Sequence, residues 1–202
     1  MITVKELRIW GFGSIVRKSK YNFNTPGLTI LKGPNGFGKT SIFSALTYAW
    51  FGVTLKGKNS ITTWPEIQPR DFQGTRVKST IEVDGETYHI IRHCNYKGKT
   101  NGVKGRNSLM LFKGDTLVTT RDKRDVQNEI NKLLGFSFDL FRTFVVFGQK
   151  MKRLISEDGP TKKKILEEAF EMAYISEIRK EYEGKQKDLV LEVTKLESQE
   201  AV

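Results

Sequence analysis

The run Gly33-Pro34-Asn35-Gly36-Phe37-Gly38-Lys39-Thr40 constrains the fold of this 202-residue chain more than any other feature. It matches the phosphate-loop pattern G-x-x-x-x-G-K-[ST] at every fixed position. A short apolar run precedes it at 28–31, and a run rich in Ala, Leu and aromatic residues follows it and stops at Gly52. We therefore expect a buried strand over 28–31, a phosphate-binding loop over 33–40 and a buried helix over 40–51, the core of an α/β fold.

The chemistry of this loop predicts a nucleoside triphosphate site. Glycines let successive backbone N–H groups curl around phosphate oxygens, and the start of a helix adds partial positive charge. We expect Lys39 to reach the β- and γ-phosphates of ATP and the Thr40 hydroxyl to bind Mg²⁺. Further ATP contacts are expected from the remaining loop residues Asn35, Gly36, Phe37 and Gly38 and from Ser41.

Short apolar stretches separated by Gly- and Lys-containing turns fill most of the first 150 residues. Alternation of apolar and polar residues predicts strands, and Gly-containing turns between such runs predict hairpins. The expected elements are a strand over 2–9, a hairpin of 78–83 with 88–92, a hairpin of 108–112 with 116–119, an amphipathic helix over 125–134 and a second buried apolar run over 141–147.

The character of the sequence changes after Pro160. No proline and only one glycine follow, and Ile175, Ile178, Tyr182, Leu189 and Leu196 recur at steps of three, four and seven. This spacing is typical of a coiled-coil seam, although two charged residues interrupt it. A continuous helix from Thr161 would be roughly 60 Å long at 1.5 Å per residue, so we expect it to leave its domain. The alternative is one long surface helix. The predicted division is a domain over 1–160 and a helical exit over 161–202.

Composition narrows the class of protein. No run approaches the roughly 18 apolar residues of a membrane span, and the charged N-terminus does not suit a signal peptide. A lone cysteine, Cys94, excludes an internal disulfide. These features predict a soluble intracellular protein. The net charge of +11 favours a polyanionic partner, because neutralised phosphates release condensed counterions.

The loop, with Ser41 after it, resembles the GxNGxGKTS form found in ABC-type ATPases that act on DNA. The resemblance extends to Leu7-Arg8-Ile9-Trp10-Gly11-Phe12-Gly13-Ser14, to Phe144-Val145-Val146-Phe147-Gly148-Gln149, and to Pro160-Thr161-Lys162-Lys163-Lys164-Ile165-Leu166-Glu167-Glu168-Ala169-Phe170. These runs look like the family's first strand and turn, the approach to its Q-loop and its coiled-coil entry. Together they resemble the N-terminal half of SbcC-type ATPases, the SMC-like large subunits of double-strand-break repair nucleases, including phage recombination endonucleases.

This resemblance implies an ABC-type half-head, with a mixed β-sheet around the P-loop unit and the start of a long antiparallel coiled coil. The family's C-terminal half carries the signature motif and the Walker B carboxylates, which we do not find here, so the chain alone is expected to hydrolyse ATP poorly. Implied partners are that C-terminal half, a second head, an SbcD-type nuclease and double-stranded DNA. Bacterial or phage homologues would be cytoplasmic, and eukaryotic ones nuclear.

The resemblance also assigns residues outside the loop. Gln149 would be the Q-loop glutamine that contacts Mg²⁺ and the attacking water. Ser14 would approach the nucleotide, although Gly13 stands where the family often has a polar or basic residue. Thr62 and Thr63 lie in the segment that passes the adenine edge in relatives.

Two basic stretches are candidates for sequence-independent DNA contact. The first contains Arg92, Lys97, Lys99, Lys104 and Arg106 with no acid among them, and the second contains Lys150, Lys152 and Arg153 where the coil leaves the head. Solvated surface loops are the alternative. Two other functions also remain open: a DNA-organising ATPase of the condensin type without a nuclease, and a small-molecule P-loop kinase.

Overall fold

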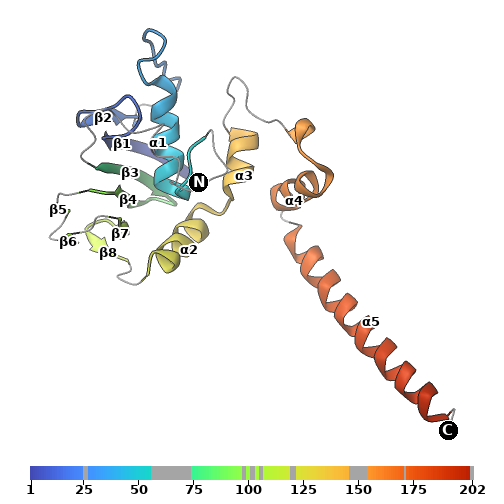
Figure 1. The fold of residues 1–202 in the computed structure, drawn as a ribbon. Helices are drawn as coiled ribbons and strands as arrows, with labels where there is room; N and C mark the ends of the chain where they lie inside the picture. The colour runs from blue at the N-terminus through green and yellow to red at the C-terminus, as the bar shows by residue number, and fades with distance from the viewer. Residues whose placement is uncertain are drawn as a thin grey trace. The chain divides into compact units, whose positions relative to one another are not determined.

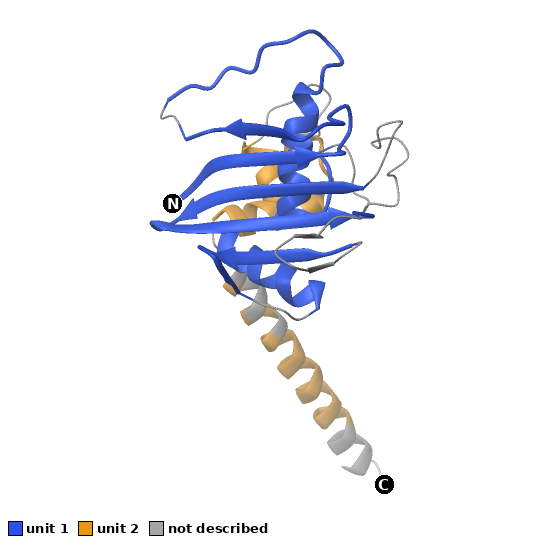
Figure 2. Ribbon diagram, turned by 90° about the vertical axis from the view of Figure 1, so that its left-hand side faces the viewer, with its two compact units in different colours: residues 1–138 blue, residues 139–202 orange. Residues whose placement is uncertain are grey.

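The computed structural model describes residues 1–24, 27–55, 74–96, 99–100, 103–104, 107–118, 122–145, 154–170 and 172–200, in places by backbone alone. The chain forms two compact units, Met1–Phe138 and Asp139–Val202, coloured separately in Figure 2. Each unit is described by itself.

Unit 1 is built on a six-stranded sheet in the order β2-β1-β3-β4-β7-β8, in which all neighbouring strands are antiparallel (Figure 1). The strands are β1 (Ile2–Trp10), β2 (Ser19–Asn22), β3 (Thr75–Val83), β4 (Glu86–Cys94), β7 (Leu109–Lys113) and β8 (Thr116–Leu117). A separate short pair joins β5 (Lys99–Thr100) to β6 (Val103–Lys104). The expected first strand and both hairpins are therefore confirmed, with Asp84 and Gly85 at positive φ in the β3–β4 turn.

Helix α1 (Lys39–Phe51) packs on one face of this sheet, behind the strands in the view of Figure 2. Its buried side chains include Ile42, Ala45 and Tyr48, and Trp50 Nε1 donates to Ser79 Oγ on β3 at 3.0 Å. The core of unit 1 is completed by buried strand residues that alternate along β1, β3 and β4: Leu7, Ile9, Val77, Ile81 and Ile90.

Helix α2 (Lys123–Leu134) buries Val126, Ile130 and Leu134, one stripe of an amphipathic helix. Both helices end as expected at glycines in the left-handed conformation, Gly52 at φ 75° and Gly135 at φ 70°. A glycine at this position allows the cap N–H to bond back to the last turn without a Cβ penalty. The two helices predicted for unit 1 are thus confirmed.

Unit 2 is helical. The short α3 (Phe138–Leu140) continues into a π-helical turn at Phe141–Val145, and a 3₁₀ turn at Leu154–Ser156 precedes α4 (Gly159–Ala169) and α5 (Ala173–Glu200). Asp158 caps α4, because its side chain accepts from the Thr161 N–H, and Pro160 lies in the first turn, where a missing N–H costs nothing. Helix α5 has 28 residues, about 42 Å at 1.5 Å per residue.

Four expectations are corrected, two of them in unit 1. Residues 28–31 form no strand; they are irregular, with Leu28 88% and Ile30 63% exposed, because no described strand lies beside them to accept their hydrogen bonds. The described sheet is antiparallel rather than mixed for the same reason.

The other two corrections concern unit 2. The apolar run that starts at Phe141 was expected to be buried, but its described part is a helical turn in which Phe144 and Val145 are exposed. The helix expected from Thr161 is also not continuous. It is interrupted between Ala169 and Ala173, where Met172 N–H donates to the Glu167 carbonyl at 2.6 Å. Within the described part of the chain, no helix is both long and apolar enough to cross a membrane.

Candidate functional site

The loop at 33–40 leads directly into α1. Gly36 (φ 84°) and Gly38 (φ 87°) adopt the left-handed conformation, and Gly38 is the N-cap residue of the helix. Glycine adopts this conformation without the steric cost that a Cβ would bring. No acidic residue occurs in the first turn of α1, and Gly38 has no side chain to accept from its N–H groups. The start of α1 therefore offers backbone donors and helix-dipole charge to an anion.

Lys39 reaches back across the loop. Its Nζ donates to the carbonyl oxygens of Gly33, at 2.5 Å, and Pro34, at 2.8 Å. The ammonium is thus held beside the loop backbone by two uncharged acceptors, which a phosphate could replace with stronger charge-assisted bonds. Thr40 and Ser41 follow in the first turn of α1, with Thr40 exposed. One cation, helix N–H groups and a hydroxyl form a donor set that fits a Mg²⁺-bound phosphate chain.

Ser14 lies against this loop. A Cβ added to Gly38 would lie 2.6 Å from Ser14 Oγ, so the two residues are in close contact. The turn that carries Ser14 is closed by reciprocal backbone bonds between Phe12 and Ile15, both 3.0 Å. Phe12 is fully buried and packs against Tyr48 of α1, with ring centroids 5.6 Å apart. The turn after β1 and helix α1 are therefore held together by two contacts, Ser14 with Gly38 and Phe12 with Tyr48.

Arg92 anchors the other end of α1. Its Nε donates to the Ala49 carbonyl at 3.3 Å, and its Nη2 donates to Gln127 Oε1 at 2.5 Å. Gln127 Nε2 in turn donates to the Trp50 carbonyl at 2.8 Å. Burial lowers the pKa of Arg92 to about 10, while Tyr48 raises it slightly. Arg92 therefore joins α1 to α2, and its assignment to the basic hairpin was wrong.

A buried ion pair lies in unit 2. Arg142 Nη2 lies 3.0 Å from Glu157 Oε1, with the two side chains only 9% and 1% exposed, and Asp139 contacts the same guanidinium nitrogen at 3.4 Å. The pair joins the π-helical turn to the residue before the α4 cap. Neither Arg142 nor Glu157 was singled out from the sequence, because no local pattern links residues 15 apart.

The structure does not describe the side chains of the other expected site residues. Thr62, Thr63 and Gln149 lie outside the described residues, as do Lys97, Arg106, Lys150, Lys152 and Arg153. Lys99 and Lys104 are described by backbone alone, paired with each other across the β5–β6 hairpin. No group of three His, Cys, Asp or Glu residues that could hold a metal ion is found where the structure describes side chains.

Comparison with known proteins agrees with the form of this site. A family model described as an AAA domain matches residues 6–201. The "DNA double-strand break repair Rad50 ATPase" of Methanocaldococcus jannaschii is 32% identical over 189 residues, which are 89% of this chain and 17% of that protein. The SbcC component of the nuclease SbcCD of Clostridium acetobutylicum is 26% identical over 176 residues, 82% of this chain and 14% of that protein. The chain thus spans about a sixth of the length of these relatives.

A solved structure supports the fold. It comes from work on ATP-driven dimerisation and DNA-stimulated activation of SMC ATPases, and it superimposes with a TM-score of 0.54 over 82% of this chain and 98% of its own. The sequence identity is 15%, so the likeness concerns the fold alone. With the family match covering nearly the whole chain, we conclude that this protein belongs to the AAA domain family and is similar, over most of its length, to Rad50 and SbcC proteins.

Proposed function

We propose that this chain is the ATP-binding N-terminal lobe of an ABC-type ATPase head in a complex that repairs DNA double-strand breaks. The observation that carries the proposal is the arrangement of the loop, in which the Lys39 ammonium, two left-handed glycines and the start of α1 converge. The names of the relatives, a break-repair ATPase and a component of a nuclease, support the biological role.

In this proposal each residue has a distinct task. Lys39 exchanges the carbonyls of Gly33 and Pro34 for the β- and γ-phosphate oxygens of ATP, which are stronger acceptors. Thr40 would supply a hydroxyl ligand to Mg²⁺, and the bound ion would supply positive charge beside the phosphates. Ser14, in contact with the loop, limits the space available beside Gly38. Gln149 would position the ion and the attacking water.

Hydrolysis and output would require further partners. We infer that a C-terminal half supplies the signature motif and Walker B carboxylates, and that ATP joins two heads into a clamp on DNA that controls an SbcD-type nuclease. Helix α5 would begin the antiparallel coiled coil, because its apolar residues Ile178, Tyr182 and Leu189 are 48%, 66% and 60% exposed. A partner helix would bury this stripe.

The test of the site is Lys39→Ala in the chain combined with its C-terminal half, with ATP binding measured by calorimetry. Hydrogen bonds to charged groups contribute about 1.5–3 kcal/mol, so affinity should fall roughly 10- to 150-fold. Lys132→Ala is the matched control, since Lys132 lies on α2 and pairs with Glu129 at 2.9 Å, away from the loop. Equal ATP affinity of Lys39→Ala and the control would refute the phosphate role.

Gln149→Ala tests the second role in the same assembly. Because this amide would act on the ion and on coupling rather than on phosphate anchoring, ATP affinity should change less than about threefold, a factor that corresponds to about 0.7 kcal/mol. ATP-dependent dimerisation, measured by light scattering, should weaken. Unchanged dimerisation would count against this assignment.

A further inference from the structure

A cavity of about 370 Å³ lies in unit 1 at the end of α1 that is far from the nucleotide loop. Its lining comes from α1, from the end of β4 and the residue after it, from the start of β7 and the two residues before it, and from the first residue of α2. Lys39 and Tyr48 are nine residues apart on α1, so the loop and the cavity are separated by about 14 Å along the helix.

The interior of the cavity is apolar and its rim is polar. Tyr48, Cys94 and Leu109 are buried, whereas Asn107 and Lys123 are exposed at the edge. Small-molecule sites have this form, with volumes of roughly 300–1,000 Å³, so the volume of this cavity suits a small ligand.

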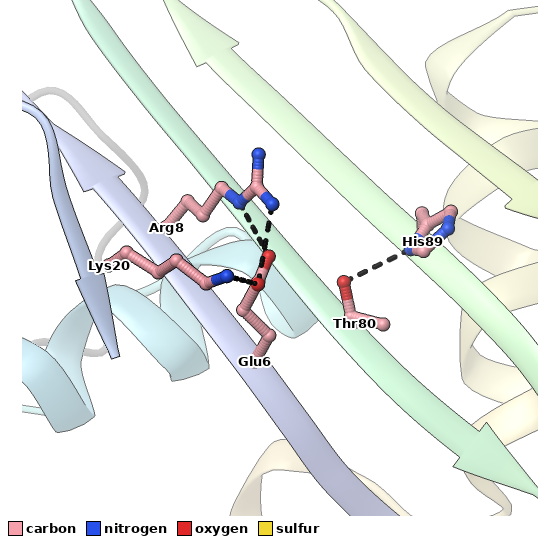
Figure 3. Close-up of polar contacts among 5 residues, drawn as sticks. All are labelled: Glu6, Arg8, Lys20, Thr80 and His89. Atoms are coloured by element: carbon pink, nitrogen blue, oxygen red, sulfur yellow. Dashed lines mark hydrogen bonds and ion pairs between the residues drawn. The ribbon is translucent and has the colours of Figure 1, made fainter. Parts of the chain in front are cut away.

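The lining carries the cations Arg92 and Lys123, and none of the lining residues is acidic. Lys123 makes no ion pair within the part of the chain that the structure describes. Elsewhere in unit 1, by contrast, cations share an acid: Arg8 Nε and Lys20 Nζ bind the carboxylate of Glu6 at 2.5 and 2.9 Å (Figure 3). The cavity therefore has an excess of positive charge that its own lining does not neutralise.

The contacts of Arg92 are all uncharged. Its guanidinium donates to the carbonyls of Ala49 and Trp50 and to Gln127 Oε1, and its central carbon lies 5.5 Å from the centre of the Tyr48 ring. Burial lowers its pKa only to about 10, so the group stays protonated at neutral pH. A partly buried cation with neutral neighbours is stabilised by an anion that enters beside it.

The rim adds further donors. Asn107 Oδ1 accepts from the Asn95 N–H at 2.9 Å, so the NH₂ group of the same carboxamide remains as a donor for a ligand. Burial raises the pKa of the Cys94 thiol to about 11, and the Lys123 ammonium opposes this effect. The charge of Lys123 therefore acts on the interior of the cavity as well as on its edge.

We propose that this cavity binds a small phosphate monoester, with the phosphate at Arg92 and Lys123 and the organic group against Tyr48 and Leu109. A phosphate monoester presents three strong acceptor oxygens on one atom, which matches a guanidinium, an ammonium and a carboxamide that converge on one cavity. The site is separate from the nucleotide loop, and the proposal does not depend on the function proposed for that loop.

The chain supplies its own reporter, because Cys94 is its only cysteine and lines the cavity. The rate of Cys94 alkylation by iodoacetamide is measured by mass spectrometry on the full chain, with phenyl phosphate as the probe. At about pH 8 the probe is a dianion, since the second pKa of a phosphate ester is about 6. A bound probe covers the thiol, so the rate should fall about tenfold when the probe is present at about ten times its Kd.

Two neighbouring residues in the first turn of α2 give matched variants. Lys123 and Arg124 are both exposed, but only Lys123 lines the cavity. Lys123→Gln should weaken protection by phenyl phosphate about fivefold, and Arg124→Gln by less than about 1.5-fold. Each variant is compared by its ratio of rates with and without the probe, because Lys123 also affects the pKa of the thiol.

The charge reversal Lys123→Glu separates ligand binding from a structural effect. It should weaken protection by roughly 25-fold. An acidic residue at the start of a helix stabilises that helix, so a damaged α2 would not explain this loss. Equal protection in Lys123→Gln and Arg124→Gln, or no protection of the wild type by phenyl phosphate, would overturn the proposal.

Two further comparisons identify the site and the ligand. Lys39→Ala should leave the protection of Cys94 unchanged, and its loss in that variant would overturn the proposal by placing the probe at the nucleotide loop. Succinate, a dianion whose two charges lie on separate carboxylates, should protect less well than phenyl phosphate. Equal protection by succinate would overturn the assignment of the ligand as a phosphate monoester.

Discussion

The contact between Gly38 and Ser14 gives a sharp test of the loop geometry, through the pair of variants Gly36→Ala and Gly38→Ala. Both glycines have positive φ, 84° and 87°, so both substitutions carry the left-handed penalty of about 1–2 kcal/mol for an L-residue. They differ in their surroundings. A Cβ at Gly36 meets nothing within 4 Å, whereas a Cβ at Gly38 lies 2.6 Å from Ser14 Oγ.

This difference fixes the expected magnitudes. Moving Ser14 out of its rotamer to relieve the overlap adds about 0.5–1.5 kcal/mol to the Gly38 variant alone. The free energy of unfolding should therefore fall by about 1–2 kcal/mol in Gly36→Ala and by about 1.5–3.5 kcal/mol in Gly38→Ala. Removing the hydroxyl with Ser14→Ala should return the cost of Gly38→Ala to that of Gly36→Ala, because the next atom, Ile15 Cγ1, is at an ordinary 3.5 Å.

Urea unfolding followed by tryptophan fluorescence measures these values, since Trp10 and Trp50 both belong to unit 1. The wild type, the two single variants at positions 14 and 38 and their double variant form a double-mutant cycle with an expected coupling energy of about 1 kcal/mol. Equal costs for the two glycine variants, or a coupling energy near zero, would show that Ser14 does not contact the loop in solution.

Two further predictions concern buried charge. Arg142→Met leaves Glu157 buried without its cation and should destabilise unit 2 by about 3–5 kcal/mol, whereas the double variant Arg142→Met/Glu157→Met should cost much less. Hydrogen exchange of the α4 amides measures the stability of both variants. Equal costs would contradict a direct interaction between the two side chains. Burial, with a smaller contribution from Arg76, lowers the pKa of His93 from 6.5 to about 4, so unit 1 should lose stability as pH falls through this range. Part of this loss should disappear in His93→Gln, and identical urea midpoints against pH for both proteins would refute the assignment.

Local features of this fold were predictable from the sequence. Gly52 and Gly135 marked the ends of α1 and α2, and Asp84-Gly85 marked the β3–β4 turn, because such positions depend on the conformational freedom of one or two residues. Ser14 lies against Gly38, although 24 positions separate the two in the chain, and its approach to the nucleotide stays a prediction.

Features that depend on distant partners were not predictable. Arg8 and Lys78 become neighbours only through the register of β1 with β3, and Arg92 is partly buried only because α1 and α2 meet beside it. The interruption before α5 contains no glycine or proline, at Phe170-Glu171-Met172, and so carries no sequence signal. A strand at 28–31 failed as a prediction because apolar character alone cannot supply a hydrogen-bonding neighbour.

The exposed residues 28–30 imply that assembly with a further polypeptide segment and the affinity for nucleotide depend on each other. They enter the loop just before Gly33, whose carbonyl holds Lys39, so a strand added alongside them would order the entrance to the site. Burying Leu28 and Ile30 against such a strand would contribute about 1.5–3 kcal/mol each. Thermodynamic linkage makes the effect mutual: if the added strand increases the affinity for ATP by some factor, ATP increases the affinity for the strand by the same factor. Bound nucleotide would then strengthen the association of the two polypeptide segments, and the apparent affinity for nucleotide would depend on protein concentration.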